Sequence, residues 1–214
     1  MLADSERFSE AMRRFDAANS EDPHHEVVDG VSYPKELLYA QRLTAWLERF
    51  APEASAALRL AARSQHIRRW VIPRDHYPMD RLGYLQWRTN LAKFHADTAA
   101  TILREVGYNE ATIQRVRSLL RKEGLKRDPE VQCLEDVICL VFLESYCADF
   151  AGQQDAAKAL GILRKTWSKM SPRGREVARA AGLRAEVQRL IEAALAADLD
   201  DVSEIEPDRT PDEP

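Results

Sequence analysis

The sequence predicts an all-α protein, a single helical domain of about eight helices. Apolar residues recur at i, i+3, i+4 and i+7 along nearly the whole chain, which is the spacing of one buried helix face. Alternating apolar and polar runs, which form half-buried strands, are scarce. The chain has 214 residues, 45% of them hydrophobic and 31% charged, a balance typical of a globular protein with a large core.

The expected helices are placed by their starting and stopping residues. Pro34 stands at the first position of one helix, and Gly107 directly follows another. Pro73 and Pro78 interrupt the helical pattern between the helices predicted over residues 52–70 and 84–106. The stretch NSEDPHHEVVDGVSYP, residues 19–34, is expected to be a long loop. The predicted helices cover residues 5–18, 35–50, 52–70, 84–106, about 110–122, 130–150, 154–168 and 172–197.

The acidic residues are concentrated at the end of the chain. We expect residues 1–197 to form the helical domain and residues 198–214 to be a disordered acidic tail, because the tail holds eight acids, one base and three prolines. Without it the net charge of −4 becomes slightly positive, since 30 basic and 27 acidic residues remain. So small a surplus argues against nucleic acid as a partner, which needs a larger basic footprint.

The sequence predicts a cytoplasmic protein that does not enter a membrane. No run approaches the roughly 18 apolar residues that a membrane-spanning helix needs. The N-terminal stretch MLADSERFSEAMRRF is charged throughout and lacks the apolar centre of a signal peptide. The oligomeric state is not indicated by any pattern in the chain.

One segment, residues 63–95, differs in composition from the rest. It holds three of the five histidines, six arginines and two of the four tryptophans, against two acids. Helix packing does not need this mixture, because Arg is almost never fully buried unless it is paired. Guanidinium groups bind phosphate or carboxylate with two parallel hydrogen bonds, and indole rings stack on planar groups. The candidate substrate-binding residues are Arg68, Arg69, Trp70, Arg74, Trp87 and Arg88.

Several phrases of the chain resemble a family known as domain of unknown function 4202. They are FDAANSEDP, PKELLYAQRL, SQHIRRW, YPMDRLGYLQWR, LEDVICLVFLE and KTWSKMS, and the resemblance extends over about residues 8–175. It implies a soluble protein and carries no established activity. The roles of individual residues therefore rest on their own chemistry.

The order of polar residues is also similar to that of the HD-domain phosphohydrolases, an all-α family with a metal-centred site. The pair QH that ends in His66, after LRLAARS, stands at the family's His-Asp pair. His95 stands at a later family histidine, and Asp136, within CLEDVICL, at the closing aspartate. Tyr39 stands in place of the first family histidine. The resemblance implies an HD-domain-like core in which His66, His95 and Asp136 bind a divalent transition metal.

Two glutamates complete the predicted site. Glu36 lies one helical turn before Tyr39 and could supply a further carboxylate ligand. Either Glu36 or Glu135 could act as the general base on a metal-bound water. The function predicted from these residues is a metal-dependent hydrolase, HD-like, that acts on a small phosphorylated or anionic substrate.

Two other functions are consistent with the same residues. The chain could be a metal-free nucleotide-binding or anion-binding module, because the first family histidine and the order of the His-Asp pair are not kept. It could also be a helical protein-interaction domain whose aromatic and basic segment faces another protein. Each single His or Arg has a structural alternative as well, as a helix cap, a core residue or a salt-bridge partner.

Overall fold

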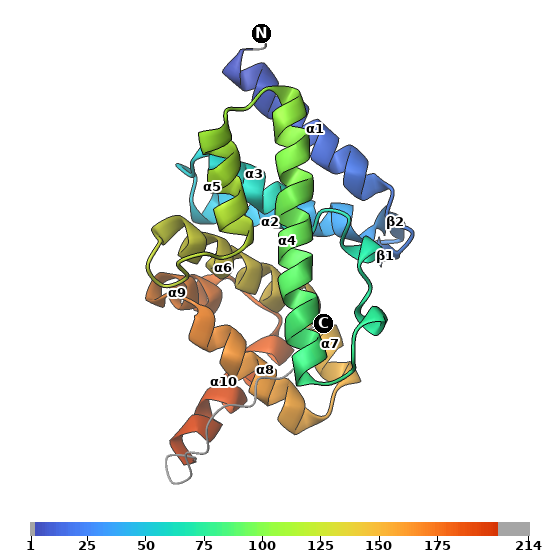
Figure 1. The fold of residues 1–214 in the computed structure, drawn as a ribbon. Coiled ribbons are helices and arrows are strands. Elements are labelled where there is room, and N and C mark those ends of the chain that lie inside the picture. Colours follow the sequence, from blue (N-terminus) through green and yellow to red (C-terminus); the bar gives the residue numbers. More distant parts are fainter. Residues whose placement is uncertain (1–2, 201–214) are drawn as a thin grey trace. The chain divides into compact units, whose positions relative to one another are not determined.

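The computed structural model describes residues 3–200, with side chains for residues 3–196. Within that range the chain forms ten α-helices and one short antiparallel hairpin, so the predicted all-α class is confirmed (Figure 1). The elements of the first part are α1 (Asp4–Ser20), β1 (His25–Val28), β2 (Val31–Pro34), α2 (Lys35–Phe50), α3 (Ala56–Ser64), the 3-10 turns η1 (Arg69–Val71) and η2 (Arg74–His76), α4 (Arg81–Val106), α5 (Glu110–Leu120) and α6 (Pro129–Val141). After a π-helical turn, Phe142–Tyr146, come α7 (Cys147–Gln153), α8 (Ala156–Lys169), α9 (Pro172–Ala180) and α10 (Ala185–Asp200).

The chain divides into two compact units. Unit 1 is Met1–Leu134 and unit 2 is Glu135–Pro214, so the boundary falls inside α6. The single domain over residues 1–197 stays a prediction. The predicted acidic tail lies almost wholly outside the described residues, and α10 continues to Asp200.

Unit 1 is built around α4, a helix of 26 residues. In Figure 1, α1 and α5 lie along α4, and α3 packs against both α1 and α5. Apolar side chains at helical spacing fill the space between them, which is why this pattern folds as a bundle. The start of α4 is fixed by Asp80, whose side chain accepts a hydrogen bond from the backbone N–H of Gly83, and its end by Gly107 at φ 92°. The largest fully buried side chains of unit 1 are Phe15, Leu43, Leu47, Leu60, Ile67, Leu103, Ile113, Leu119 and Leu134.

One predicted helix is shorter than expected, and another is divided in two. The helix predicted over residues 52–70 begins only after Ser55, whose side chain accepts from the backbone N–H of Leu58 over 3.1 Å, and it ends at Ser64. Arg68 then adopts a left-handed conformation at φ 53°, which no helix continues through. The helix predicted over residues 172–197 is two helices, separated at Gly182 with φ 64°.

The loop predicted over residues 19–34 contains a β-hairpin. Strands β1 and β2 pair antiparallel, with Val28 opposite Val31. The two residues between them, Asp29 at φ 51° and Gly30 at φ 79°, have the positive φ values of a type I′ turn. The prediction of a loop was wrong here because it did not use the Asp-Gly signal within VVDGVS.

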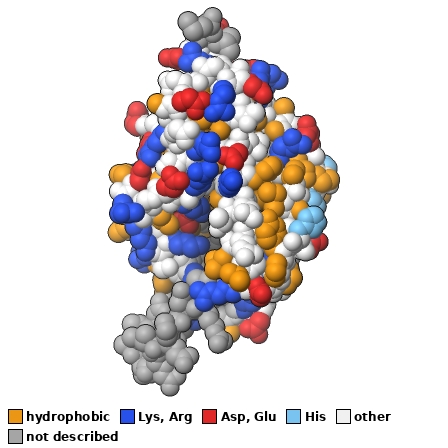
Figure 2. Space-filling view, in the orientation of Figure 1, with side chains coloured by type: hydrophobic (Ala, Val, Ile, Leu, Met, Phe, Trp, Pro, Cys, Tyr) orange, Lys and Arg blue, Asp and Glu red, His pale blue; other side chains and the backbone are white. Residues whose placement is uncertain are grey.

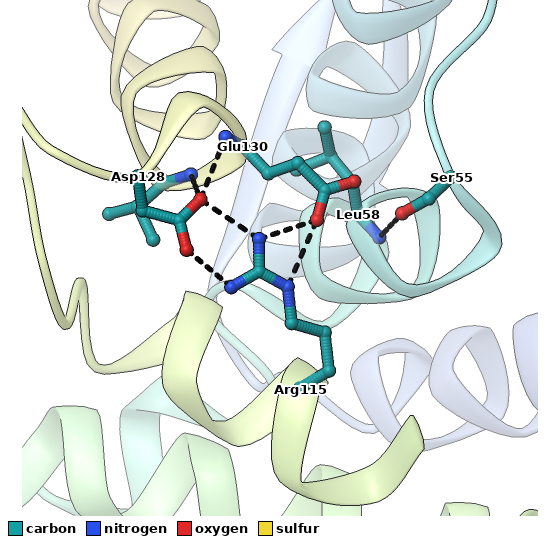
Figure 3. A network of polar contacts seen from close by, with 6 residues as sticks. Ser55, Leu58, Arg115, Asp128 and Glu130 are labelled. Atoms are coloured by element: carbon teal, nitrogen blue, oxygen red, sulfur yellow. Dashed lines mark hydrogen bonds and ion pairs between the residues drawn. The ribbon is translucent and has the colours of Figure 1, made fainter. Parts of the chain in front are cut away.

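The connection from α5 to α6 is held by one arginine. Arg115 donates to both carboxylate oxygens of Asp128, at 2.5 and 2.9 Å, and to Glu130, at 2.5 and 3.0 Å (Figure 3). Asp128 also accepts from the backbone N–H groups of Glu130 and Val131, at 2.9 and 3.3 Å. The turn therefore owes its shape to a network that also caps the start of α6.

In unit 2, α8 packs against α10 and α7. Asp136, near the start of this unit, accepts hydrogen bonds from the backbone N–H of Ser171 over 2.7 Å and from its hydroxyl over 2.5 Å. The same hydroxyl accepts from the N–H of Gly174 over 3.0 Å and so caps α9. The carboxylate of Asp136 thus orders the cap of a helix.

Candidate functional site

Three predicted site residues of unit 1 lie together. His66 follows the end of α3, and its ring stacks on that of Tyr39 in α2, with ring centres 4.2 Å apart and an angle of 9° between the rings. The ring centre of His95, in the middle of α4, lies 5.8 Å from that of His66. The carboxylate of Glu36, at the start of α2, lies 3.3 Å from Nδ1 of His66. Glu36, His66 and His95, which were predicted to share a site with Asp136, therefore lie side by side in unit 1. The roles predicted for them stay predictions.

The hydrogen bonds of His66 fix which ring nitrogen carries its proton. Arg69 Nη1 lies 3.0 Å from His66 Nε2, and a guanidinium only donates, so Nε2 is the unprotonated nitrogen. In the neutral ring the proton is then on Nδ1, which faces Glu36. The pKa of His66 is lowered well below its usual value, by burial first and then by the charges of Arg69 and Arg88. His66 is therefore a neutral imidazole, with 19% of its side chain exposed.

His95 has the same tautomer. Its Nδ1 donates to the backbone carbonyl of Ile67 over 2.8 Å, since a carbonyl only accepts. Burial and then the nearby His66 lower the pKa of His95 to about 3, so the ring is neutral and Nε2 carries a lone pair. His95 is 3% exposed, and within the described part of the chain Nε2 has no hydrogen-bond partner. A buried acceptor without a donor costs free energy and indicates a missing partner.

Glu36 is held in place by the end of α1 and the residues that follow it. Its backbone N–H donates to Asp22 Oδ2 over 3.0 Å, and its carbonyl accepts from Asn19 Nδ2 over 3.5 Å. The side chain is nearly buried, and this burial raises the pKa of the carboxyl group, while the charge of Arg69 acts in the opposite direction. Glu36 thus orients His66 from a position that is itself fixed by two buried polar residues.

The predicted anion-binding residues divide into two groups. The guanidinium of Arg69 lies 5.1 Å from the ring centre of Trp87, whose indole N–H donates to the carbonyl of Ile72 over 2.9 Å. Arg88 is part-buried in α4, and its charge also acts on Arg69. Arg69, Trp87 and Arg88 therefore lie with Glu36, His66 and His95, and these six residues are called the histidine cluster below.

The other members have structural partners or lie beside the cluster. Arg74 donates to the carbonyls of Tyr77 and Pro78, at 3.1 and 2.7 Å, and so shapes the turn before α4. Arg68 pairs with Glu21 at 3.2 Å. Trp70 is half-buried in η1. We assign no ligand contact to Arg74.

Glu135 and Asp136 belong to unit 2, and both are buried. The carboxylate of Asp136 orders the Ser171 cap described above. Among the described residues, no group of three or more His, Cys, Asp or Glu side chains is arranged to hold a metal ion. The metal ligation by His66, His95 and Asp136, and the general-base role of Glu135, stay predictions.

Asn19 and Asp22 are buried polar residues that the sequence analysis missed. Asn19 is fully buried, and its Oδ1 accepts from the backbone N–H of Arg68 over 3.0 Å, which supports the left-handed turn after His66. Asp22 is 3% exposed and also accepts from the N–H of His24. The signal that could have found them is the run NSEDP, in which short polar side chains follow a helix and can bind nearby backbone groups.

The chain matches the family described as "Domain of unknown function (DUF4202)" over residues 9–191. It belongs to this family. The DUF4202 match begins within α1 and ends within α10, and it contains every residue of the histidine cluster. Neither the curated proteins nor the solved structures contain a match to the chain. The HD-like core therefore stays a prediction for this DUF4202 chain.

The surface and the helices of this DUF4202 chain give two further findings. In the upper part of the face shown in Figure 2, acidic side chains lie among the Lys and Arg side chains. Ion pairs such as Arg104 with Glu110, at 2.7 Å, and Arg117 with Asp97, at 2.6 Å, join α4 and α5.

Of the helices within the described range, none is long and apolar enough to cross a membrane.

Proposed function

We propose that this DUF4202 chain is a metal-dependent hydrolase of small phosphorylated or anionic substrates, with His66 and His95 as the metal-binding pair. The observation that carries the proposal is the buried Nε2 of His95, a lone pair without a donor at 3% exposure. A divalent transition metal is the partner that a neutral imidazole binds best.

The hydrogen bonds on the opposite nitrogens support this function. A metal-binding histidine usually donates its other ring N–H to a carboxylate or a backbone carbonyl. His66 Nδ1 faces the Glu36 carboxylate at 3.3 Å, and His95 Nδ1 donates to Ile67. Two imidazoles that bind one metal through Nε2 at about 2.1 Å have ring centres about 5 to 6 Å apart. The separation of 5.8 Å between His66 and His95 fits that range.

In this proposal the predicted role of Glu36 is different. Its carboxylate faces the protonated nitrogen of His66, so it orients a metal-binding ring instead of binding the metal itself. Water and the substrate would complete the coordination. The metal would lower the pKa of its bound water and so supply the nucleophile. Arg69 and Arg88 would bind the anionic group of the substrate beside the Trp87 ring.

The test is the metal content of the untagged protein. We expect a near-stoichiometric transition metal in the wild type, measured by plasma mass spectrometry, and its loss in His66→Ala and His95→Ala. His76→Ala is the matched control, because His76 is exposed in η2. Hydrolysis of a panel of phosphomonoesters and phosphodiesters should then require the metal. A wild type that neither contains nor takes up a transition metal would sink the proposal.

A second function, a metal-free anion-binding module, is favoured by one contact. Arg69 donates to His66 Nε2 over 3.0 Å, and this guanidinium occupies the lone pair that a metal would need. In that case Arg69 and Arg88 would bind a nucleotide or another anion without turnover. Thermal stabilisation by nucleotides in the presence of a strong chelator, with no hydrolysis on metal addition, would support this function over the hydrolase.

A further inference from the structure

The position of Arg69 links metal binding to anion binding. We propose that Arg69 exchanges partners: its guanidinium holds His66 Nε2 when no metal is bound, and it turns to the anionic group of the substrate when a metal takes that nitrogen. This inference rests on the proposed function, and it makes Arg69 the residue that couples the two ligands.

The first step concerns one lone pair. An unprotonated imidazole nitrogen has a single lone pair, which either accepts one hydrogen bond or binds one metal. At His66 this lone pair, on Nε2, accepts a hydrogen bond from Arg69 Nη1 over 3.0 Å. A metal at His66 must therefore displace the guanidinium, whereas the lone pair at His95 Nε2 is already available.

The second step concerns the destination of the guanidinium. It lies over the Trp87 ring, 5.1 Å from the ring centre, and the indole N–H is anchored on Ile72 at 2.9 Å. This fixed aromatic face can carry a guanidinium that moves away from His66, because cations are attracted to the face of an indole ring. The half-buried position of Arg69 in η1 lets the side chain reach a ligand that approaches the exposed edge of His66.

The third step concerns charge. A displaced guanidinium beside a divalent cation is repelled, and the carboxylate that lies against His66 is that of Glu36. An anionic group that binds both the metal and Arg69 removes this repulsion. Metal and anion should therefore strengthen each other's binding, and such coupling is reciprocal, with typical factors of about 5 to 150. The planar fork of Arg69 favours a group with two oxygens, such as a phosphate or a carboxylate.

The experiment measures the affinity of Co²⁺ by competition with a chelator, with and without sulfate as the tetrahedral anion. In the wild type we expect sulfate to increase Co²⁺ affinity by about tenfold. In Arg69→Leu, Co²⁺ should bind several-fold more tightly than in the wild type without sulfate, because the competing guanidinium is gone. The effect of sulfate should then be much smaller, because only Arg88 remains to bind the anion.

The matched control is Arg88→Leu, which also removes a positive charge that acts on His66. If charge alone decided Co²⁺ affinity, both variants would show the same gain, and the exchange at Nε2 would be refuted. Arg69→Lys is the second variant, which keeps the charge but not the fork, and in it the effect of sulfate should fall. Circular dichroism checks that each variant is folded.

The outcomes separate this inference from the proposed function. Equal Co²⁺ affinity in the wild type and Arg69→Leu, or sulfate binding that is independent of the metal, would overturn the exchange and leave the metal site standing. Absence of Co²⁺ binding in every variant would remove both.

Discussion

His95 Nδ1 donates to the backbone carbonyl of Ile67 over 2.8 Å, a bond that joins residues 28 positions apart in the chain. It ties the middle of α4 to the turn that follows α3, and it fixes the ring so that Nε2 faces away from this carbonyl. Because both partners are buried, the imidazole is held neutral. The bond therefore determines the direction and the tautomer of the ring, whereas burial keeps it neutral.

The buried His95 should make the folded chain sensitive to acid. Its pKa is about 3 when folded, against 6.5 for an exposed histidine, so between these values the unfolded chain binds a proton that the folded chain does not. The free energy of unfolding should therefore fall as the pH is lowered from about 6.5 towards 3, with a slope of up to about 1.4 kcal/mol per pH unit from this residue. The lowered pKa of His66 acts in the same direction, whereas the raised pKa of Glu36 opposes it just above pH 4.5.

The measurement is urea unfolding at several pH values between 6 and 4. The slope in His95→Gln should be smaller than in the wild type by about 1 kcal/mol per pH unit. His76→Gln, at an exposed histidine, should keep the wild-type slope. Parallel curves for the wild type and His95→Gln would contradict the assignment of a neutral buried ring.

Asn19 should contribute strongly to stability. Its amide bonds the backbone at Arg68 N and at Glu36 O, and the side chain is fully buried, so Asn19→Ala leaves buried backbone groups without partners. We expect a loss of about 1 to 3 kcal/mol in the free energy of unfolding. The exposed neighbour Ser20 is the control, and Ser20→Ala should cost less than about 0.5 kcal/mol. A similar small cost for both variants would show that Asn19 is dispensable.

The Arg115 network should act mainly through the cap of α6. Asp128→Ala removes acceptors for the N–H groups of Glu130 and Val131, and we expect a cost of about 1 to 2 kcal/mol (Figure 3). Asp128→Asn retains a capping oxygen and should cost about half as much. The control is Asp97→Ala, because Asp97 pairs with Arg117 at the surface, and its free energy of unfolding should change by no more than about 0.5 kcal/mol. Equal losses for Asp128→Ala and Asp128→Asn would assign the effect to the ion pair instead.

Two glycines of unit 2 should respond to alanine with opposite signs. A Cβ added at Gly174 would lie 2.6 Å from Oδ1 of Asp136, so the carboxylate that holds Ser171 must shift. We expect Gly174→Ala to lower the free energy of unfolding by about 1 to 3 kcal/mol. At Gly161, inside α8, nothing lies within 4 Å, and Gly161→Ala should raise it by about 0.5 to 1 kcal/mol. Denaturant unfolding of both variants checks this, and a stabilised Gly174→Ala would contradict the described contact.

Much of the helical fold could be predicted from the sequence because local signals mark many helix ends. α2 has the predicted bounds, Lys35–Phe50, since Pro34 fixes its start, and α4 ends at the predicted Gly107. The helix predicted after Pro52 was too long, because a contact between distant parts of the chain ends the real helix at Ser64. Arg68 adopts a left-handed conformation that its side chain disfavours, and the amide of Asn19, 49 residues away, supports it. Hydrophobic periodicity carries no information about such a contact.

The site could be predicted only in part, because the sequence shows the types of its side chains but not the groups that pack against them. The composition of residues 63–95 indicated a site for an anion or a metal, and the HD-like order of residues placed His66 and His95 in it with Asp136. The partners that give these residues their properties are a carbonyl at Ile67 and the carboxylate of Glu36, whose positions depend on how the helices pack. A backbone carbonyl is present at every residue, so no pattern of side chains could have identified the one that fixes His95.

The place of the unit boundary has a consequence for how this chain can be shortened in experiments. Domain boundaries usually fall in exposed linkers, where recombination or proteolysis can separate one module from another. Here the boundary at Leu134 falls inside α6, and a cut there would sever the ladder of backbone hydrogen bonds within one helix. A shortened protein should therefore keep α6 whole, and the DUF4202 match over residues 9–191 includes both sides of this boundary.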